Sequence, residues 1–158
     1  TVGRARGRLS IVGIGPGQAA WRTPEVTSWL GTATDVVGYG LYLDLLGDLI
    51  NGKERHMSKL SEEEARVRRS IELAAEGRDV ALVSSGDAGI YAMAALAFEV
   101  LDRDNNPKFN RIEMRVSPGI SAVQAAAARI GAPLGHDFAL ISLSVSETFV
   151  PCRLHVLR

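Results

Sequence analysis

The sequence predicts an α/β protein built on one five-stranded parallel sheet with helices on both faces. Short β-branched apolar runs alternate with longer segments of helical character along the 158 residues. Strands separated by helices form parallel sheets, and such sheets bury both of their faces under the helices. A chain of this length with 46% apolar residues can bury one hydrophobic core. The predicted strands are residues 9–15, 35–40, 79–85, 111–117 and 138–144.

The helices between these strands are predicted from the signals at their ends. Thr23 and Pro24 are residue types that favour the N-cap and the first position of a helix, so a helix should begin there. Ser61 and Glu64 have the spacing of a capping box and predict the start of a second helix. Asp87 is also a preferred N-cap residue and precedes a third, apolar segment. The predicted helical segments are residues 23–33, 61–77, 87–103 and 121–131.

The composition limits the partners and the location of the protein. Eighteen Lys and Arg residues balance eighteen Asp and Glu residues without a block of one sign, so no nucleic-acid surface is expected. The longest apolar runs are far shorter than the roughly 20 residues that span a bilayer, so no membrane segment is predicted. The single cysteine, Cys152, excludes an internal disulfide and fits a reducing compartment. Residues 1–8 are basic but lack the apolar core of a signal peptide, which predicts a cytoplasmic protein.

Glycine-rich stretches follow four of the predicted strands. They are residues 13–17 (GIGPG), 38–40 (GYG), 84–91 (SSGDAGIY) and 117–121 (SPGIS). Any one of them has the composition of an ordinary turn. In a parallel sheet, however, the carboxyl ends of the strands meet at one edge, where open α/β sheets bind their ligands. The sequence therefore predicts a ligand site built from backbone at this edge.

The first glycine-rich stretch only partly matches a dinucleotide-binding fingerprint. Gly13 and Gly15 fit, but Gln18 takes the place of the third glycine and Pro16 removes a backbone donor. Asp35 opens its predicted strand, whereas an acid that binds the ribose should close one. No Gly-Lys-Ser/Thr follows the glycines, which excludes a Walker loop. Loops without cations suit a ligand with adenine, ribose and amino-acid ends better than a polyphosphate.

Four segments of the chain resemble the tetrapyrrole methylase family. They are VGIGPG, VVGY, VALVSSGDAGIYAMAALAFEVL and SPGISAVQAAAARIGAPLGHDFALISLS, which together cover most of residues 8–144. The resemblance implies a two-domain α/β fold that binds S-adenosyl-L-methionine in a cleft between the domains. It also implies methylation of precorrin-3B at carbon 17, with ring contraction and loss of carbon 20, in cobalamin synthesis. Such a methyl transfer depends mainly on holding both reactants in the reactive geometry and on excluding water.

The resemblance also assigns roles to residues. Asp87 and His136 are the candidates for acid–base chemistry, with helix capping as the structural interpretation of Asp87. His136 and Asp137 are neighbours, and such pairs are more often structural or solvated. Tyr39 and Tyr42 offer flat surfaces for a macrocycle, and core packing is the competing interpretation. The predicted cofactor-binding residues are Gly15, Pro16, Gly17, Gly86, Asp87, Ala88, Ile90, Tyr91, Ser121 and Ala122.

No metal site is predicted, because His56 and His155 have no partners at ligand spacing. The charged run SEEEARVRRS is typical of a solvated helix face with ion pairs one turn apart.

The expected organisation is an N-terminal tail (residues 1–8), a cofactor-binding domain (9–144) and a tail that departs from the family pattern (145–158). Members of the family continue into a second α/β domain, which this chain is expected to lack. Three functions remain open: a tetrapyrrole methyltransferase or its cofactor-side half, expected to be a homodimer; a nicotinamide-dependent oxidoreductase; and a non-catalytic, self-associating remnant.

Overall fold

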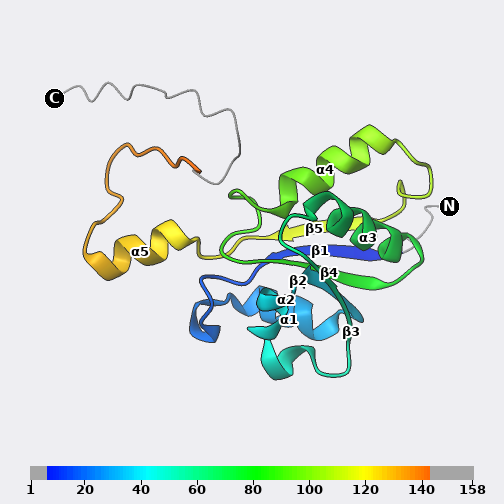
Figure 1. The fold of residues 1–158 in the computed structure, drawn as a ribbon, viewed down its shortest axis with the longest axis horizontal. Coiled ribbons are helices and arrows are strands. Elements are labelled where there is room, and N and C mark those ends of the chain that lie inside the picture. The colour runs from blue at the N-terminus through cyan, green and yellow to red at the C-terminus, as the bar shows by residue number, and fades with distance from the viewer. Residues whose placement is uncertain (1–6, 143–158) are drawn as a thin grey trace.

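The structure, a computed structural model, describes residues 7–142 and contains one sheet of five parallel strands (Figure 1). This confirms the predicted fold class. The order of the strands across the sheet is β3-β2-β4-β1-β5. The strands are β1 (Arg8–Gly13), β2 (Asp35–Tyr39), β3 (Glu54–Ser58), β4 (Asp79–Ser84) and β5 (Glu113–Ser117).

Helices cover both faces of the sheet, as predicted. In Figure 1, α3 and α4 lie over one face and α1 and α2 lie under the other, whereas α5 extends past the carboxyl ends of the strands. The helices are α1 (Pro24–Thr32), α2 (Gly40–Asp44), α3 (Glu63–Ala75), α4 (Met93–Asp104) and α5 (Ala122–Ile130), and two 3-10 helices are η1 (Ala19–Trp21) and η2 (Gly47–Ile50).

The central strand, β4, contributes to a hydrophobic core on each face of the sheet. Side chains alternate between the faces of a strand. Val80 and Leu82 of β4 accordingly join the cluster under α3 and α4, while Ala81 and Val83 join the cluster against α1 and α2. All four are essentially inaccessible to solvent. This burial on both faces explains why the run VALV predicts its strand so clearly.

One predicted strand is wrong, and one strand was not predicted. Residues 138–142 of the predicted strand 138–144 contain no strand, and residues 143 and 144 lie outside the described residues. The fifth strand is instead β3, which pairs with β2 at the edge of the sheet. Its sequence, ERHMS, has no apolar alternation because most of its side chains face solvent.

The helix starts were predicted with mixed success. The hydroxyl of Thr23 accepts the N–H of Val26 (3.2 Å) and caps α1 as expected. The capping box at Ser61 is wrong, because α3 begins at Glu63 and its N-cap is Glu62. The carboxylate of Glu62 accepts the N–H of Lys59 (2.8 Å) and so orders the preceding turn.

The third helix begins later than predicted. Residues 87–92 form a turn-rich loop, and α4 starts at Met93 with Ala92 as its N-cap. Asp87 is therefore not the N-cap of α4. The long loop between β4 and α4 lies at the carboxyl edge of the sheet, where a ligand site was expected. Among residues 7–142, no helix is long and apolar enough to cross a membrane.

Candidate functional site

The carboxyl edge of the sheet has a topological switch point between β1 and β4. These strands are neighbours, but the chain leaves β1 towards α1 on one face and leaves β4 towards α4 on the other (Figure 1). Connections that diverge in this way leave a crevice beyond the strand ends, and open α/β sheets bind ligands there. The strand order differs from the 3-2-1-4-5-6 order of a Rossmann domain.

The loops after β1, β4 and β5 meet at this point through their backbones. Gly15 and Gly86 exchange two hydrogen bonds, of 3.1 and 2.8 Å, which join the first two loops. A Cβ on Gly119, in the third loop, would lie only 2.2 Å from the carbonyl oxygen of Gly86. Glycine at 119 therefore allows the loop after β5 to pack directly on the loop after β4.

Asp87 connects two of these loops. Its Oδ1 accepts the N–H of Gly89 (2.7 Å), and its Oδ2 accepts the N–H of Gly119 (2.9 Å). Both carboxylate oxygens are thus held by backbone donors, one within the loop and one from the loop after β5. The structural role of Asp87 is to join loops, which replaces the predicted role as a helix cap.

These loops line an open cavity of about 480 Å³, which we call the glycine-loop cavity. Its volume lies within the roughly 300–1,000 Å³ of small-molecule sites. Gly15 and Ala88, both predicted to bind the cofactor, are buried behind its wall. The other predicted cofactor residues all line it: Pro16, Gly17, Gly86, Asp87, Ile90, Tyr91, Ser121 and Ala122.

The tyrosines predicted to contact the substrate have different positions. Tyr42, in α2, lines the glycine-loop cavity and packs on the core below the sheet. Tyr39 does not line the glycine-loop cavity, and its ring meets that of Tyr42 edge-on at 5.3 Å. The segment 40–50 that contains Tyr42 is anchored by the buried side chains of Leu43 and Ile50.

Tyr91 adopts an unusual backbone conformation next to the cavity. Its φ of 49° is left-handed, a region that side-chain-bearing residues rarely adopt and that occurs often at functional sites. Its hydroxyl donates to the carbonyl oxygen of Leu140 (2.7 Å), so it holds the segment after α5 against the opening. His136, the other predicted acid–base residue, is exposed in that segment and does not line the glycine-loop cavity.

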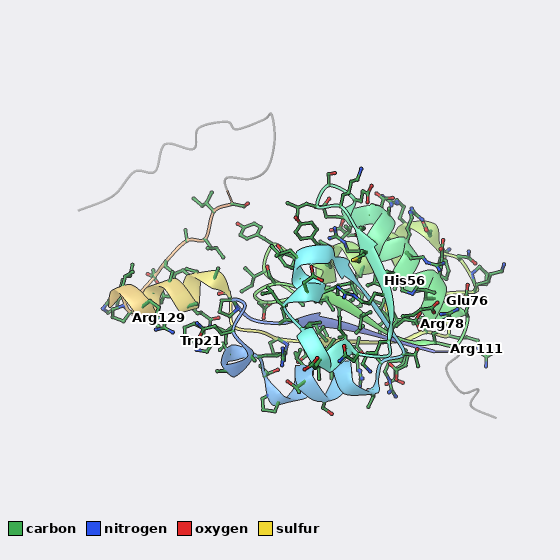
Figure 2. The ribbon with its side chains drawn as sticks, turned by 60° about the horizontal axis from the view of Figure 1, so that its bottom comes forward. Trp21, His56, Glu76, Arg78, Arg111 and Arg129 are labelled. Carbon is green, nitrogen blue, oxygen red and sulfur yellow. The ribbon has the colours of Figure 1, made fainter. Side chains whose placement is uncertain are left out.

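The position of α5 is supported from outside the cavity. No residue of α5 is buried, but the guanidinium of Arg129 lies over the ring of Trp21, 5.2 Å from its centroid. Figure 2 shows Trp21 and Arg129 together at one end of the molecule, opposite His56 and Arg78. This contact joins α5 to η1, and thereby to the loop that follows β1.

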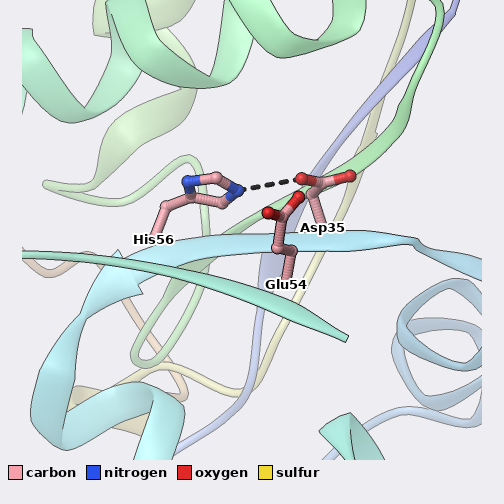
Figure 3. A group of neighbouring side chains, drawn as sticks. All are labelled: Asp35, Glu54 and His56. Carbon is pink, nitrogen blue, oxygen red and sulfur yellow. Dashed lines mark hydrogen bonds and ion pairs between the residues drawn. The ribbon is translucent and has the colours of Figure 1, made fainter. Parts of the chain in front are cut away.

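A second polar cluster lies at the opposite, amino edge of the sheet (Figure 3). Nε2 of His56 is 2.8 Å from Oδ1 of the buried Asp35, and Glu54 is beside them. Their ligand atoms lie within 4.8 Å of one another, but Arg78 donates to both carboxylates. Burial raises the pKa of Asp35, yet side-chain hydrogen bonds, led by that of Thr34, outweigh it and leave this pKa below its ordinary 3.8. We interpret the cluster as an ion-pair network that fastens β2 to β3.

The diverging loops and the cavity that they line are features of the α/β proteins that bind small ligands at the carboxyl edge of a parallel sheet. Comparison of sequences identifies the family within this class. Residues 8–152 match the family described as Tetrapyrrole (Corrin/Porphyrin) Methylases, and the chain belongs to that family.

Named relatives agree with this assignment. The chain is 44% identical over 138 residues to a precorrin-3B C(17)-methyltransferase from Sinorhizobium, with 87% of this chain and 54% of that protein covered. It is also 44% identical to a probable cobalt-factor III C(17)-methyltransferase from Salmonella typhimurium, with 86% and 55% covered. The protein CobIJ of Mycobacterium bovis is 45% identical, but only 26% of its length is covered.

The solved structures show the same relationship. The methyltransferase CobJ superposes with a TM-score of 0.81 at 45% identity, over 88% of this chain and 57% of that one. The cobalt precorrin-4 methyltransferase CbiF gives 0.66 at 26% identity, over 82% and 52%. The chain thus spans about half the length, or less, of the relatives that it matches.

Proposed function

We propose that the glycine-loop cavity binds S-adenosyl-L-methionine and that the chain serves methyl transfer to a tetrapyrrole of cobalamin synthesis. The observation that carries this proposal is the convergence of three strand-end loops on one cavity that eight predicted cofactor residues line. When bound, this cofactor supplies an electrophilic methyl group on a sulfonium. The residues that line the cavity hold and orient it for transfer.

The charge of the cavity fits this cofactor. Among the described residues that line it, Asp87 is the only charged one, and none carries a positive charge. A cationic sulfonium is favoured next to a carboxylate, whereas the pyrophosphate of NAD would meet no cation. The first loop also turns through η1 before α1 begins at Pro24, so the N-terminus of α1 does not directly follow the glycines of this loop, as it would in a Rossmann domain.

The shape of the cavity gives a second argument. A Cβ on Gly86 would meet no atom closer than 3.6 Å, that atom being the Cα of Ser121. A side chain here would project into the space between the loop after β4 and the start of α5. The absence of a side chain at Gly86 leaves this space available to a ligand, which the backbone can then approach closely.

Calorimetric titration tests the cofactor proposal directly. S-adenosylhomocysteine, the demethylated product, should bind to the chain in preference to NAD. Ala122→Leu replaces the methyl group of an exposed residue that lines the cavity by an isobutyl group, and it should weaken this binding at least about tenfold, or 1.4 kcal/mol. Ala128→Leu makes the same change on an exposed part of α5 away from the cavity and should leave affinity unchanged. Preferential binding of NAD, or equal affinities in both variants, would refute the proposal.

For the reaction itself we propose precorrin-3B or its cobalt-loaded counterpart as substrate, methylated at carbon 17 with contraction of the ring. The names of the relatives with 44% identity support carbon 17 and include both forms of the substrate. Mass spectrometry of the products formed from each form, with labelled cofactor, tests the position of the methyl group. Sedimentation velocity tests the homodimer expected for the family. If the chain binds the cofactor but forms no product until a second domain is supplied, only the cofactor-binding part of the proposal holds for this chain.

A further inference from the structure

A second open cavity, of about 610 Å³, lies beside the glycine-loop cavity and holds a buried arginine. We call it the Arg66 cavity, after the α3 residue whose side chain lines it and is only 4% exposed. The two cavities share Tyr42, Ser85 and Tyr91 as lining residues. A ligand that extends from one cavity can therefore reach into the other.

Arg66 is buried without a negatively charged partner. Its Nε donates to the hydroxyl of Ser58 (2.6 Å), and its Nη2 donates to the carbonyl oxygen of Lys59 (2.6 Å). Its Nη1 meets only the thioether sulfur of Met93, at 3.8 Å. Within residues 7–142, no carboxylate oxygen lies within 4.0 Å of this guanidinium. Buried arginines are normally paired, because removing a lone charge from water is costly.

Ser84, the last residue of β4, has a related deficit in the same cavity. It is 5% exposed, and its Oγ is buried with no hydrogen-bond partner in the described structure. Unsatisfied buried hydroxyls are rare in folded proteins, and each calls for an explanation. Two residues thus line one cavity and each lacks a partner in the protein: Arg66 has no negatively charged group beside it, and the hydroxyl of Ser84 has no hydrogen-bond partner.

We propose that the Arg66 cavity binds a carboxylate on a peripheral side chain of the tetrapyrrole, with Arg66 as the cation and Ser84 as a further donor. This proposal rests on the proposed function. A carboxylate supplies both of the missing partners, since it is a strong acceptor with two oxygens. Arg66 is the only cationic residue among the described lining residues, and the carboxylate of Glu63 also lines the cavity. A singly charged anion therefore fits better than a phosphate dianion.

The test measures binding of a stable, polycarboxylate tetrapyrrole, uroporphyrin III, by quenching of its fluorescence. The matched ligand is the same porphyrin with its carboxylates converted to neutral amides. Arg66→Met keeps an unbranched apolar stem in place of the arginine stem but removes the charged end, and it should weaken binding of uroporphyrin at least about tenfold while leaving the amide unaffected. Arg69→Met removes the same charge from an exposed position of α3 and should change neither affinity.

Ser84→Ala separates ligand binding from folding. Removal of a hydroxyl that has no partner in the protein should leave resistance to urea unchanged or raise it. Its affinity for uroporphyrin should nevertheless fall several-fold. If Arg66→Met fails to fold, this variant and Arg66→Lys carry the test, and Arg66→Lys should retain a preference for the carboxylate form.

The outcomes distinguish the carboxylate site from the cofactor site. The titrations with uroporphyrin and with its amide are made without S-adenosylhomocysteine. A carboxylate preference that depends on Arg66 therefore supports the proposal even if S-adenosylhomocysteine itself fails to bind. Unchanged uroporphyrin affinity in Arg66→Met and Ser84→Ala would overturn it. Loss of S-adenosylhomocysteine binding in Arg66→Met, with uroporphyrin binding intact, would also overturn it, because the anion would then belong to the cofactor.

Discussion

Replacement of Asp87 by alanine should loosen the loops that form the glycine-loop cavity. The substitution removes both acceptors, the one for Gly89 and the one for Gly119. Hydrogen bonds to a charged group contribute about 1.5–3 kcal/mol each when they are shielded from water. The Gly89 bond is exposed and local, so most of the loss comes from the partly buried Gly119 bond. We expect Asp87→Ala to lower the free energy of unfolding by about 2 kcal/mol.

Asparagine at the same position distinguishes this role from helix capping. In Asp87→Asn the side chain would keep one acceptor oxygen, but its amide nitrogen cannot accept the second N–H. This substitution should therefore cost about 1 kcal/mol, roughly half the effect of alanine. If Asp87 were a helix cap, asparagine would be nearly neutral. Asp102→Asn, on the exposed side of α4, is the matched control and should stay within about 0.5 kcal/mol of the wild type.

Urea unfolding measures these differences, and amide exchange locates them. With a slope of about 1–3 kcal/mol per molar urea, a loss of 2 kcal/mol should lower the midpoint by roughly 1 M. Exchange of the Gly119 amide should accelerate in Asp87→Ala, since that N–H loses its acceptor. Wild-type stability together with wild-type protection of Gly119 would refute the joining role. Loss of turnover with unchanged stability would instead assign Asp87 to the chemistry.

Three further changes test other parts of the structure. Asp35→Asn should cost about 3 kcal/mol at neutral pH, because it breaks a buried charge network. The folded pKa of Asp35 lies below its ordinary 3.8, so the extra stability of the wild type should be complete above about pH 4 and vanish as the pH falls through the folded value. A stability difference between wild type and variant that stays constant into strong acid, measured by urea unfolding, would contradict this. Gly119→Ala would place a methyl group 2.2 Å from the carbonyl oxygen of Gly86 and should cost about 3 kcal/mol, so an unchanged melting temperature by circular dichroism would argue against the packing described. Arg129→Ala should remove about 0.5–1 kcal/mol of contact with Trp21 and accelerate amide exchange in α5 alone, whereas uniform protection would show that α5 is held in another way.

The sequence predicts the strands whose apolar runs reflect burial on both faces of the sheet. β1 and β4 are buried on both faces, so their apolar runs identify them, and the loops that follow them could be placed at one edge. β3 could not be found in this way, because an edge strand with exposed Glu54, Arg55 and Met57 has no apolar period. The cluster of His56 with Asp35 was missed for the same reason, since only the β2–β3 pairing brings these residues together.

Residues 138–142 illustrate the opposite error. Their run FALIS has the composition of a strand, but strand propensity does not provide a pairing partner. In the described structure this segment follows α5 without forming a strand, and the hydroxyl of Tyr91 holds it near the cavity. The helix-capping alternative for Asp87 is wrong for a similar reason: local sequence suggests a cap, whereas its partner Gly119 is 32 residues away in the sequence and close only in the folded chain.

The glycines at the carboxyl edge also divide into two kinds once their surroundings are known. A Cβ on Gly13 or Gly119 would lie within 2.4 Å of the carbonyl oxygen of Gly86, so these glycines are required by backbone packing. A Cβ on Gly38 would lie 2.9 Å from the side chain of Leu43, and residues 38–40, which end β2 and begin α2 rather than forming a loop, line no part of the glycine-loop cavity. Gly17 and Gly86, by contrast, have φ values of +117° and +62°, and a Cβ on either would meet its nearest atom only at ordinary van der Waals distance, 3.9 and 3.6 Å. Glycine thus has two uses at the carboxyl edge of the sheet: at Gly13 and Gly119 it permits close packing of the backbone, and at Gly17 and Gly86 it leaves the wall of the cavity without a side chain.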